Sequence, residues 1–300
     1  MVSLGRFGAV IPSVPAAPLS APDTDAHLHT TAGTVDSGAM PEPRHVTATR
    51  YVTPLREGGS LPGLVEADDD GLYVVKFHGA GQGPRALVAE WLAGEIARAL
   101  GLPVPDLVFI DVDPGLGDAE PDEELQDLVH RSGGLNLGLD FLPGALAFNP
   151  AASPNVDPAT AADVVWLDAF VTNPDRTAAN PNLIDWHGRT WLIDHGAALY
   201  IHHTWRDPRV HAEQPFERVR DHVLLPFAEP LEAADARLAP RLGSELFAGL
   251  AAAIPDAWLP DDRAIGGADA QRTAYVDYLE RRLAARTRFV EEADRARRAA

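Results

Sequence analysis

The sequence predicts an α+β fold with two lobes: an antiparallel sheet and a helix in the first, and a mainly helical second lobe that contains one β-hairpin. Between residues 44 and 142, short alternating segments are separated by glycine-rich and acidic turns. Apolar residues recur at helical spacing at 158–170 and mostly so from residue 215 onward, with one pair of short strands in between. The chain has 300 residues, which is enough for two packed cores.

Composition sets the expected boundaries of the lobes. Residues 1–43 are rich in Ala, Pro, Ser, Thr and Gly without any period, which predicts a disordered Pro/Ala-rich tail. We expect the first lobe to occupy residues 44–142 and the second to occupy residues 143–300.

The first lobe is expected to hold strands, two helices and one ambiguous segment. The strands are predicted at 45–52, as an edge strand, and at 63–66, 72–77 and 107–112; the helices at 85–100 and 123–131; and a strand or connector at 135–142. Gly101 and Pro103 end the longer helix. One side of that helix carries bulky apolar residues, and the other carries small residues that let another element approach closely.

Two glycine-rich segments of the first lobe compete as a phosphate-binding loop. Gly58-Gly59-Ser60 precedes the second strand and offers backbone amides to phosphate oxygens. Gly79-x-Gly81-x-Gly83 follows a strand and precedes a helix, as a dinucleotide-binding loop would. It lacks the full G-x-G-x-x-G pattern and no second βαβ unit follows, so we favour the first segment.

The second lobe is expected to combine helices with one hairpin. Helices are predicted at 158–170 and, as one long amphipathic helix, at 269–298. The strands at 183–186 and 189–193 flank His187-Gly188, which is the two-residue turn of a hairpin.

Two carboxylates and one amide converge at the open end of this hairpin. Because a two-residue turn makes Pro181 face Asp194, Asn180 and Asp194 lie side by side, and Asp175 lies on the loop that enters the same hairpin. Oxygen ligands of this kind suit Mg²⁺. Each motif alone is an ordinary turn. Together, Asp-x-x-x-x-Asn, a hairpin and Asp-x-Gly have the spacing of kinase catalytic and metal loops.

A lysine and a glutamate upstream complete the pattern. Lys76 ends an apolar strand, where it needs an anion to offset its desolvation; the alternative is an edge-strand lysine that deters aggregation. A kinase lysine pairs with a carboxylate on the next helix. Glu95 falls on the bulky apolar face, whereas Glu90 falls on the small-residue face, so we favour Glu90. The alternative for either is solvation or a helical salt bridge, such as Glu95 with Arg98.

Several histidines invite a metal site. No zinc-enzyme spacing accompanies His195, His202 and His203, so we expect them at the surface or behind the metal ligands. Asp221-His222 is expected to bridge structural elements of the second lobe.

Composition excludes some classes of partner and chemistry. The formal net charge of −19 repels nucleic acid and anionic lipid, so neither is an expected partner. The absence of cysteine excludes disulfides, thiolate zinc sites and cysteine nucleophiles, and fits a cytoplasmic protein. No apolar run approaches the roughly 20 residues of a membrane span, and the first residues make a poor signal peptide.

The motifs resemble those of the HipA-like kinase family and, more distantly, the phosphatidylinositol 3- and 4-kinases. The likeness rests on Asn173-Pro174-Asp175-Arg176-Thr177 through Asn180-Pro181-Asn182, and on Trp191-Leu192-Ile193-Asp194-His195-Gly196. Upstream, Gly58-Gly59-Ser60, Val75-Lys76-Phe77 and Ala89-Glu90-Trp91-Leu92 fit the same family in order and spacing. The resemblance covers roughly residues 45–230 and implies a protein-kinase-like fold whose first lobe binds the nucleotide.

The resemblance implies an ATP- and Mg²⁺-dependent kinase. Lys76 would pair with an ATP phosphate and with Glu90, Asp175 would be the catalytic base, and Asn180 and Asp194 would hold Mg²⁺. Gly58, Gly59 and Ser60 would form the phosphate loop. The acceptor would be a serine or threonine hydroxyl of a protein, or a hydroxyl of a small molecule. Two alternatives remain open: a non-catalytic nucleotide-binding regulatory module, and a nucleotidyl transferase on the same scaffold.

Overall fold

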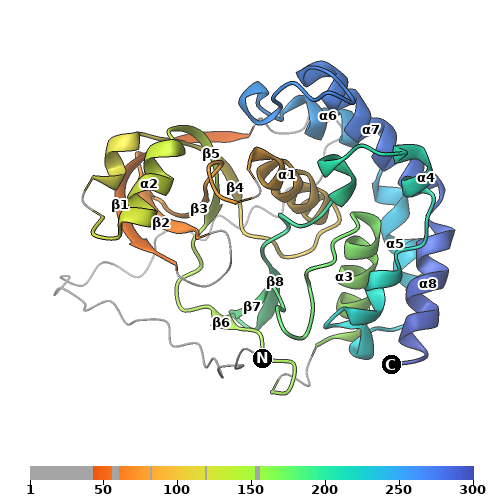
Figure 1. Cartoon of the computed structure of the whole chain (residues 1–300). Coiled ribbons are helices and arrows are strands. Elements are labelled where there is room, and N and C mark those ends of the chain that lie inside the picture. Colours follow the sequence, from red (N-terminus) through yellow and green to blue (C-terminus); the bar gives the residue numbers. More distant parts are fainter. Residues whose placement is uncertain (1–42, 56–60, 82, 119, 153–155) are drawn as a thin grey trace, which may run out of the picture. The chain divides into compact units, whose positions relative to one another are not determined.

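The computed structural model describes residues 43–55, 61–81, 83–118, 120–152 and 156–300 of the chain. Strands come first and helices follow, so the predicted α+β class is confirmed (Figure 1). The predicted tail, apart from residue 43, and the glycine-rich segment at 58–60 lie outside the described residues. The division into lobes at residue 142 stays a prediction.

Five strands close into a barrel. They are β1 (Arg44–Pro54), β2 (Gly63–Ala67), β3 (Leu72–Lys76), β4 (Leu107–Val112) and β5 (Gly134–Asp140), in the order β1-β2-β3-β5-β4. β1 pairs with β2 in antiparallel fashion and with β4 in parallel, with Arg44 opposite Val108. The prediction that the first strand is an edge strand is therefore wrong. Its parallel partner lies far along the chain, so the local pattern of β1 carries no sign of it.

The strands of the barrel separate two apolar clusters by simple alternation. On β4, Val108 and Ile110 point into the barrel, whereas Leu107 and Phe109 belong to the cluster around the long helix. The short helix α2 (Glu123–Arg131) matches its predicted bounds and contributes Leu128 to the barrel interior. Alternation of period two thus lets one strand serve two cores.

The long helix α1 (Pro84–Ala99) lies between the barrel and the C-terminal helices (Figure 1). Its small-residue side permits close approach, as predicted: a Cβ added at Gly94 would lie only 2.8 Å from Leu107 Cδ1 of β4. On the side of α1 that faces the C-terminal helices, Trp91 Nε1 donates to the carbonyl of Leu250 at 3.0 Å. The chain leaves the helix through Gly101, whose φ of 80° is the left-handed conformation typical of a helix end.

The predicted hairpin forms, with the predicted register. β7 (Leu183–Trp186) and β8 (Arg189–Leu192) pair in antiparallel fashion, and β6 (Leu146–Ala147) extends them to three strands. His187 and Gly188 have φ values of 47° and 73°, as a two-residue turn with two left-handed residues requires. Beyond the strands, the amide of Ile193 donates to the carbonyl of Asn182 at 3.1 Å, so the pairing continues toward the open end.

Six α-helices follow in the rest of the described chain: α3 (Pro158–Phe170), α4 (Pro208–Ala212), α5 (Leu231–Leu238), α6 (Ser244–Ala252), α7 (Ala268–Ala284) and α8 (Thr287–Arg297). The single long helix predicted at 269–298 is wrong, because the chain turns between α7 and α8. Near that turn, buried Arg282 donates to the carbonyl of Phe170, and Phe289 of α8 packs on Trp166 of α3. Tertiary contacts therefore break a pattern that holds no glycine or proline to stop it. Within the described part of the chain, membrane-spanning helices are absent, since none combines the needed length and apolar character.

Candidate active site

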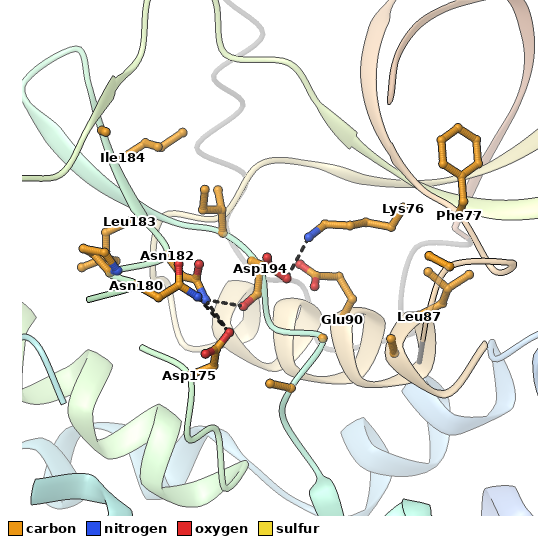
Figure 2. A pocket seen from close by; sticks show the side chains of 18 of the residues that line it. Lys76, Phe77, Leu87, Glu90, Asp175, Asn180, Asn182, Leu183, Ile184 and Asp194 are labelled. Carbon is orange, nitrogen blue, oxygen red and sulfur yellow. Dashed lines mark hydrogen bonds and ion pairs between the residues drawn. The ribbon is translucent and has the colours of Figure 1, made fainter. Parts of the chain in front are cut away.

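A cavity of about 500 Å³ gathers the predicted chemical residues. Its lining comes from the end of β3, the loop before α1, α1 itself, β6, the entrance to the hairpin and the loop after β8 (Figure 2). The lining includes five residues singled out from the sequence: Lys76, Glu90, Asp175, Asn180 and Asp194. The other three, Gly58, Gly59 and Ser60, lie outside the described residues.

Lys76 is placed by the alternation of β3. Val75 points into the barrel, so Val74 and Lys76 face the side of α1. The strand ends directly after Lys76, where buried Asn136 accepts the amide hydrogen of His78 at 2.8 Å. Lys76 Nζ forms an ion pair with Asp194 Oδ1 at 2.8 Å (Figure 2). It is also the only lysine in a sequence whose other basic residues, histidine apart, are all arginine.

Glu90 rather than Glu95 faces the lysine. Glu90 of α1 is 1% exposed and lies beside Lys76 in the cavity (Figure 2), whereas Glu95 pairs with Arg98 at 3.3 Å. Burial alone would raise the pKa of Glu90, but the ammonium of Lys76 and contacts with His195 outweigh it and lower the pKa to about 2. Burial alone would lower the pKa of Lys76, and the nearby carboxylates raise it instead. Both groups are therefore charged at neutral pH.

The histidines are more deeply buried than the sequence suggested. His195 is fully buried behind the cavity, with Nδ1 3.4 Å from Glu90 Oε1. His202 is also fully buried and its Nδ1 lies 3.0 Å from the Tyr275 hydroxyl. A surface position is thus wrong for both, whereas the contact of His195 with Glu90 agrees with the other expectation, a position behind the candidate metal ligands.

Two asparagines hold the carboxylate of Asp175. Asn180 Nδ2 donates to Asp175 Oδ2 at 3.0 Å, and Asn182 Nδ2 lies 3.3 Å from the same oxygen (Figure 2). Asn182 also reaches the carbonyl of Asp194 at 3.5 Å, so it touches both sides of the hairpin end. The sequence reasoning assigned no role to Asn182. Its position two residues after Asn180, opposite Ile193, was the signal that could have found it.

Two residues of the cavity have a strained backbone. Asn182 and Asp194 have φ values of 47° and 56°, in the left-handed region that residues with a Cβ rarely adopt. Strained residues persist where surrounding contacts over-determine them, and such positions cluster at functional sites. Here the left-handed turn at Asp194 takes the chain out of β8 beside the lysine.

The second glycine loop also faces the cavity. Ala80, Gly81 and Gly83 belong to its lining, and an added Cβ at Gly81 or Gly83 would meet no atom within 4 Å. The dinucleotide interpretation gains nothing from this, since the neighbouring strands form a barrel with antiparallel neighbours rather than a βαβ sheet. The loop instead leaves open space at the edge of the cavity, beside the start of α1.

The donor set of the cavity fits a hard divalent cation. Three carboxylates, from Glu90, Asp175 and Asp194, face the single ammonium of Lys76, which leaves an excess of negative charge. Because the Asn180 amide nitrogen is bonded to Asp175, its amide oxygen remains available as a ligand. Across the described residues, no three side chains of His, Cys, Asp or Glu come close enough to form a metal cage. A cation here would therefore rely on amide and substrate oxygens as well, as Mg²⁺ commonly does.

Comparison with solved structures finds kinases among the similar folds. Among solved structures, the chain is similar to the proinflammatory kinase CtkA of Helicobacter pylori, with a TM-score of 0.50, 13% identity, and coverage of 84% of this chain and 98% of that one. At this identity the likeness concerns the fold alone. Weaker likenesses are to the Golgi casein kinase, with a TM-score of 0.45, 12% identity, and coverage of 84% and 72%, and to its Mn/ADP-bound form, with a TM-score of 0.43, 12% identity, and coverage of 84% and 73%.

The sequence comparisons give a family rather than a single close relative. No curated protein shows a significant match to the chain. The family model for HipA-like kinases matches residues 49–289, which include all of the barrel except the first residues of β1, the described cavity residues and most of the helices. This chain therefore belongs to the HipA-like kinase family.

Proposed function

We propose that the protein is an ATP- and Mg²⁺-dependent phosphotransferase that phosphorylates a hydroxyl group, with a serine or threonine of a protein as the acceptor. One observation carries the proposal: Lys76 and Asp194 form an ion pair inside a cavity that Asp175 and Asn180 also line. These are the residue types that phosphoryl transfer requires, at the spacing that kinases use.

The cavity is large enough for a nucleotide such as ATP. Its volume of about 500 Å³ lies within the range of small-molecule sites. Phe148, Leu183 and Ile184 give one part of the lining an apolar character suited to a base, while Lys76 offers a positive charge to phosphate. The other basic side chains, histidine apart, are arginines, so the one lysine stands where a compact ammonium on a flexible stem is needed.

In this proposal Asp175 accepts the proton of the acceptor hydroxyl. The hydroxyl oxygen forms a bond to the γ-phosphorus, the bond from that phosphorus to the bridging oxygen breaks, and ADP leaves. Asn180 and Asn182 hold the carboxylate of Asp175 in one orientation through the contacts described above. Positioning of this kind supplies much of the rate enhancement of phosphoryl transfer.

Asn180 and Asp194 would hold the metal ion through oxygen atoms. When bound, Mg²⁺ neutralises phosphate charge and orients the phosphates. Glu90 and Asp194 keep the ammonium of Lys76 charged, and the ion pair with Asp194 fixes it at the end of β3, where it can bind a phosphate oxygen.

Incubation with γ-labelled ATP and Mg²⁺ tests the proposal. Label should appear on an added protein substrate or on the protein itself, should vanish in Asp194→Ala, and should persist in Asp111→Ala, which removes an exposed carboxylate of β4. Transfer from α-labelled ATP would instead establish nucleotidyl transfer. Magnesium-dependent ATP binding without any transfer would establish a non-catalytic module.

A second measurement reports on binding alone. Because Lys76 is the only side-chain amine in the chain, a nucleotide acyl phosphate that modifies amines can mark only this side chain. ATP with Mg²⁺ should protect Lys76 from the reagent, whereas Lys76→Arg should take up no label there. Unprotected labelling in the presence of saturating ATP would contradict nucleotide binding in the cavity.

A further inference from the structure

A fully buried carboxylate lies beneath the loop that enters the hairpin and carries Asp175 and Asn180, called here the candidate catalytic loop. Asp168 of α3 accepts hydrogen bonds from Arg176 Nε at 2.5 Å, His222 Nε2 at 3.0 Å and Asn173 Nδ2 at 3.1 Å. All four residues are at most 5% exposed. Burial alone would raise the pKa of Asp168, but the guanidinium of Arg176 and the hydrogen bond from His222 hold its pKa well below the usual range. The Asp168 carboxylate therefore has three hydrogen-bond donors, whereas Nη2 of Arg176 is buried without a hydrogen-bond partner among the described residues.

Arg176 connects this carboxylate to both sides of the hairpin end. Its Nη1 donates to the carbonyl of Asn182 and, at 3.3 Å, to the carbonyl of Ile193. Ile193 directly precedes Asp194, and Asn182 follows Asn180 by two residues. One planar guanidinium thus touches α3 and both backbone segments from which the candidate metal ligands project.

His222 fixes the network from a segment far along the chain. Its Nδ1 accepts the amide hydrogen of Leu224 at 3.0 Å, so its proton lies on Nε2 and is donated to Asp168. The amide of Val223 donates to the carbonyl of Arg176 at 3.0 Å, and Thr177 forms an isolated β-bridge with His222. The candidate catalytic loop is therefore held from below by side chains and from the side by backbone.

We propose that Arg176, oriented by Asp168 and His222, is a positioning residue that sets the spacing between the candidate base Asp175 and the loop carrying Asp194. This role rests on the proposed function. Lysine cannot reproduce it, because its single ammonium lacks the planar fork with which arginine reaches several acceptors at once. A small displacement of reacting groups lowers turnover far more than it lowers substrate affinity.

Arg176→Lys, measured beside Arg282→Lys, tests the role. Arg282 is a matched control, since it is equally buried and donates to backbone carbonyls of Phe170, Ala169 and Ala212 away from the cavity. Arg176→Lys should lower kcat by about 10- to 100-fold with less than about a threefold change in KM for ATP. Arg282→Lys should leave kcat within about twofold. An equal fall of kcat in both variants at equal loss of Tm would overturn the proposal.

Substitutions at His222 separate the network from general packing. His222→Gln keeps a donor near the position of Nε2 for Asp168, whereas His222→Asn keeps only the acceptor for Leu224. Turnover should be retained in His222→Gln to within about threefold and should fall about tenfold or more in His222→Asn. The reverse order would overturn the role of the bond to Asp168.

Hydrogen exchange tests the positioning without any need for turnover. The amide of Ile193, which is bonded across to Asn182, and the amide of Thr177 should exchange about tenfold faster or more in Arg176→Lys than in Arg282→Lys. Unchanged exchange at both amides refutes the positioning role even if the protein proves to be a kinase. If these amides exchange faster in Arg176→Lys but the wild-type protein transfers label from neither γ-labelled nor α-labelled ATP, the proposed function is refuted and the structural role of Arg176 is retained.

Discussion

Removal of the Lys76 ammonium should destabilise the fold through the glutamate it leaves behind. In Lys76→Met the side chain keeps its approximate length, but Glu90, which is 1% exposed, loses its main source of opposite charge. Burial is the largest influence on the pKa of Glu90 and acts to raise it, so without the lysine this pKa should rise from about 2 to above its ordinary 4.5. The carboxylate becomes an uncompensated buried charge.

The size of the effect follows from the same shift. If the pKa of Glu90 rises from about 2 to at least 4.5, the unfolding free energy at neutral pH falls by about 3 kcal/mol. Removal of one partner of a buried ion pair costs about 3–5 kcal/mol in other proteins, which agrees. In Lys76→Met the pKa of Glu90 is higher in the folded protein than its value of 4.5 in the unfolded chain. The contribution of Glu90 to the unfolding free energy is therefore fully present below pH 4.5 and is lost as pH rises through its folded-state pKa.

Urea unfolding at pH 7.5 and pH 5 measures the effect. Lys76→Met should lose about 3 kcal/mol relative to wild type at pH 7.5 and less at pH 5, where Glu90 takes up a proton. The double variant Lys76→Met/Glu90→Gln should recover most of the loss, which a double-mutant cycle with Glu90→Gln alone quantifies. A pH-independent loss, or a double variant no more stable than Lys76→Met, would refute the coupling between these two residues.

Three further predictions rest on single features of the structure. Carbon-13 lysine labelling should give one side-chain resonance, from Lys76, that titrates above the ordinary pKa of 10.5 and titrates lower in Glu90→Gln; an unchanged midpoint in that variant would contradict the electrostatic account. His202 is buried and its pKa is lowered well below 6.5, so its stabilising contribution is present above pH 6.5 and is lost as pH falls below that value. Between pH 7.5 and 5.5 the unfolding free energy should therefore fall less steeply in His202→Asn than in wild type, with slopes that differ by up to about 1.4 kcal/mol per pH unit. Parallel curves for the two proteins would contradict this role of His202. Gly94→Ala should cost about 1–3 kcal/mol in urea unfolding because an added Cβ meets a leucine of β4, whereas Gly81→Ala, with open space around its Cβ, should stay within about 0.5 kcal/mol of wild type; equal effects would contradict the packing.

The candidate site was predictable where its parts are joined by short-range geometry. The two-residue turn at His187-Gly188 sets the register of the hairpin, and the register brings the segment containing Asn180 to that containing Asp194. Asp175 follows from its spacing to Asn180 on the entering loop. The bounds of α2 and α3 were also predicted correctly, because the spacing of apolar residues that marks each helix lies within its own segment.

Other parts of the site needed contacts between distant segments. Periodicity alone placed Glu90 and Glu95 on different faces of α1, but only the packing of that helix against β4 and the C-terminal helices brings Glu90 to the lysine. The role of Asn182 was also hidden, since it contacts the other strand of the hairpin. The sequence predicted that Asp221-His222 bridges elements of the second lobe, but not that His222 reaches Asp168. A pattern within one segment holds no information about which carbonyl or carboxylate will stand opposite it.

The same physical difference separates the successes and failures of the fold prediction. By itself the sequence determined four of the five barrel strands, the hairpin and its turn, the helix end marked by Gly101, and the presence of one lysine on an apolar strand, because each depends on hydrogen bonds and side-chain periods within a few residues. Only the tertiary structure decided that β1 closes a barrel against β4, and that the last helical pattern breaks between α7 and α8. It also decided that Arg176 joins three segments at one guanidinium. These features arise where burial of apolar surface brings distant segments together, and the free energy that selects them belongs to the assembled core rather than to any local stretch of chain.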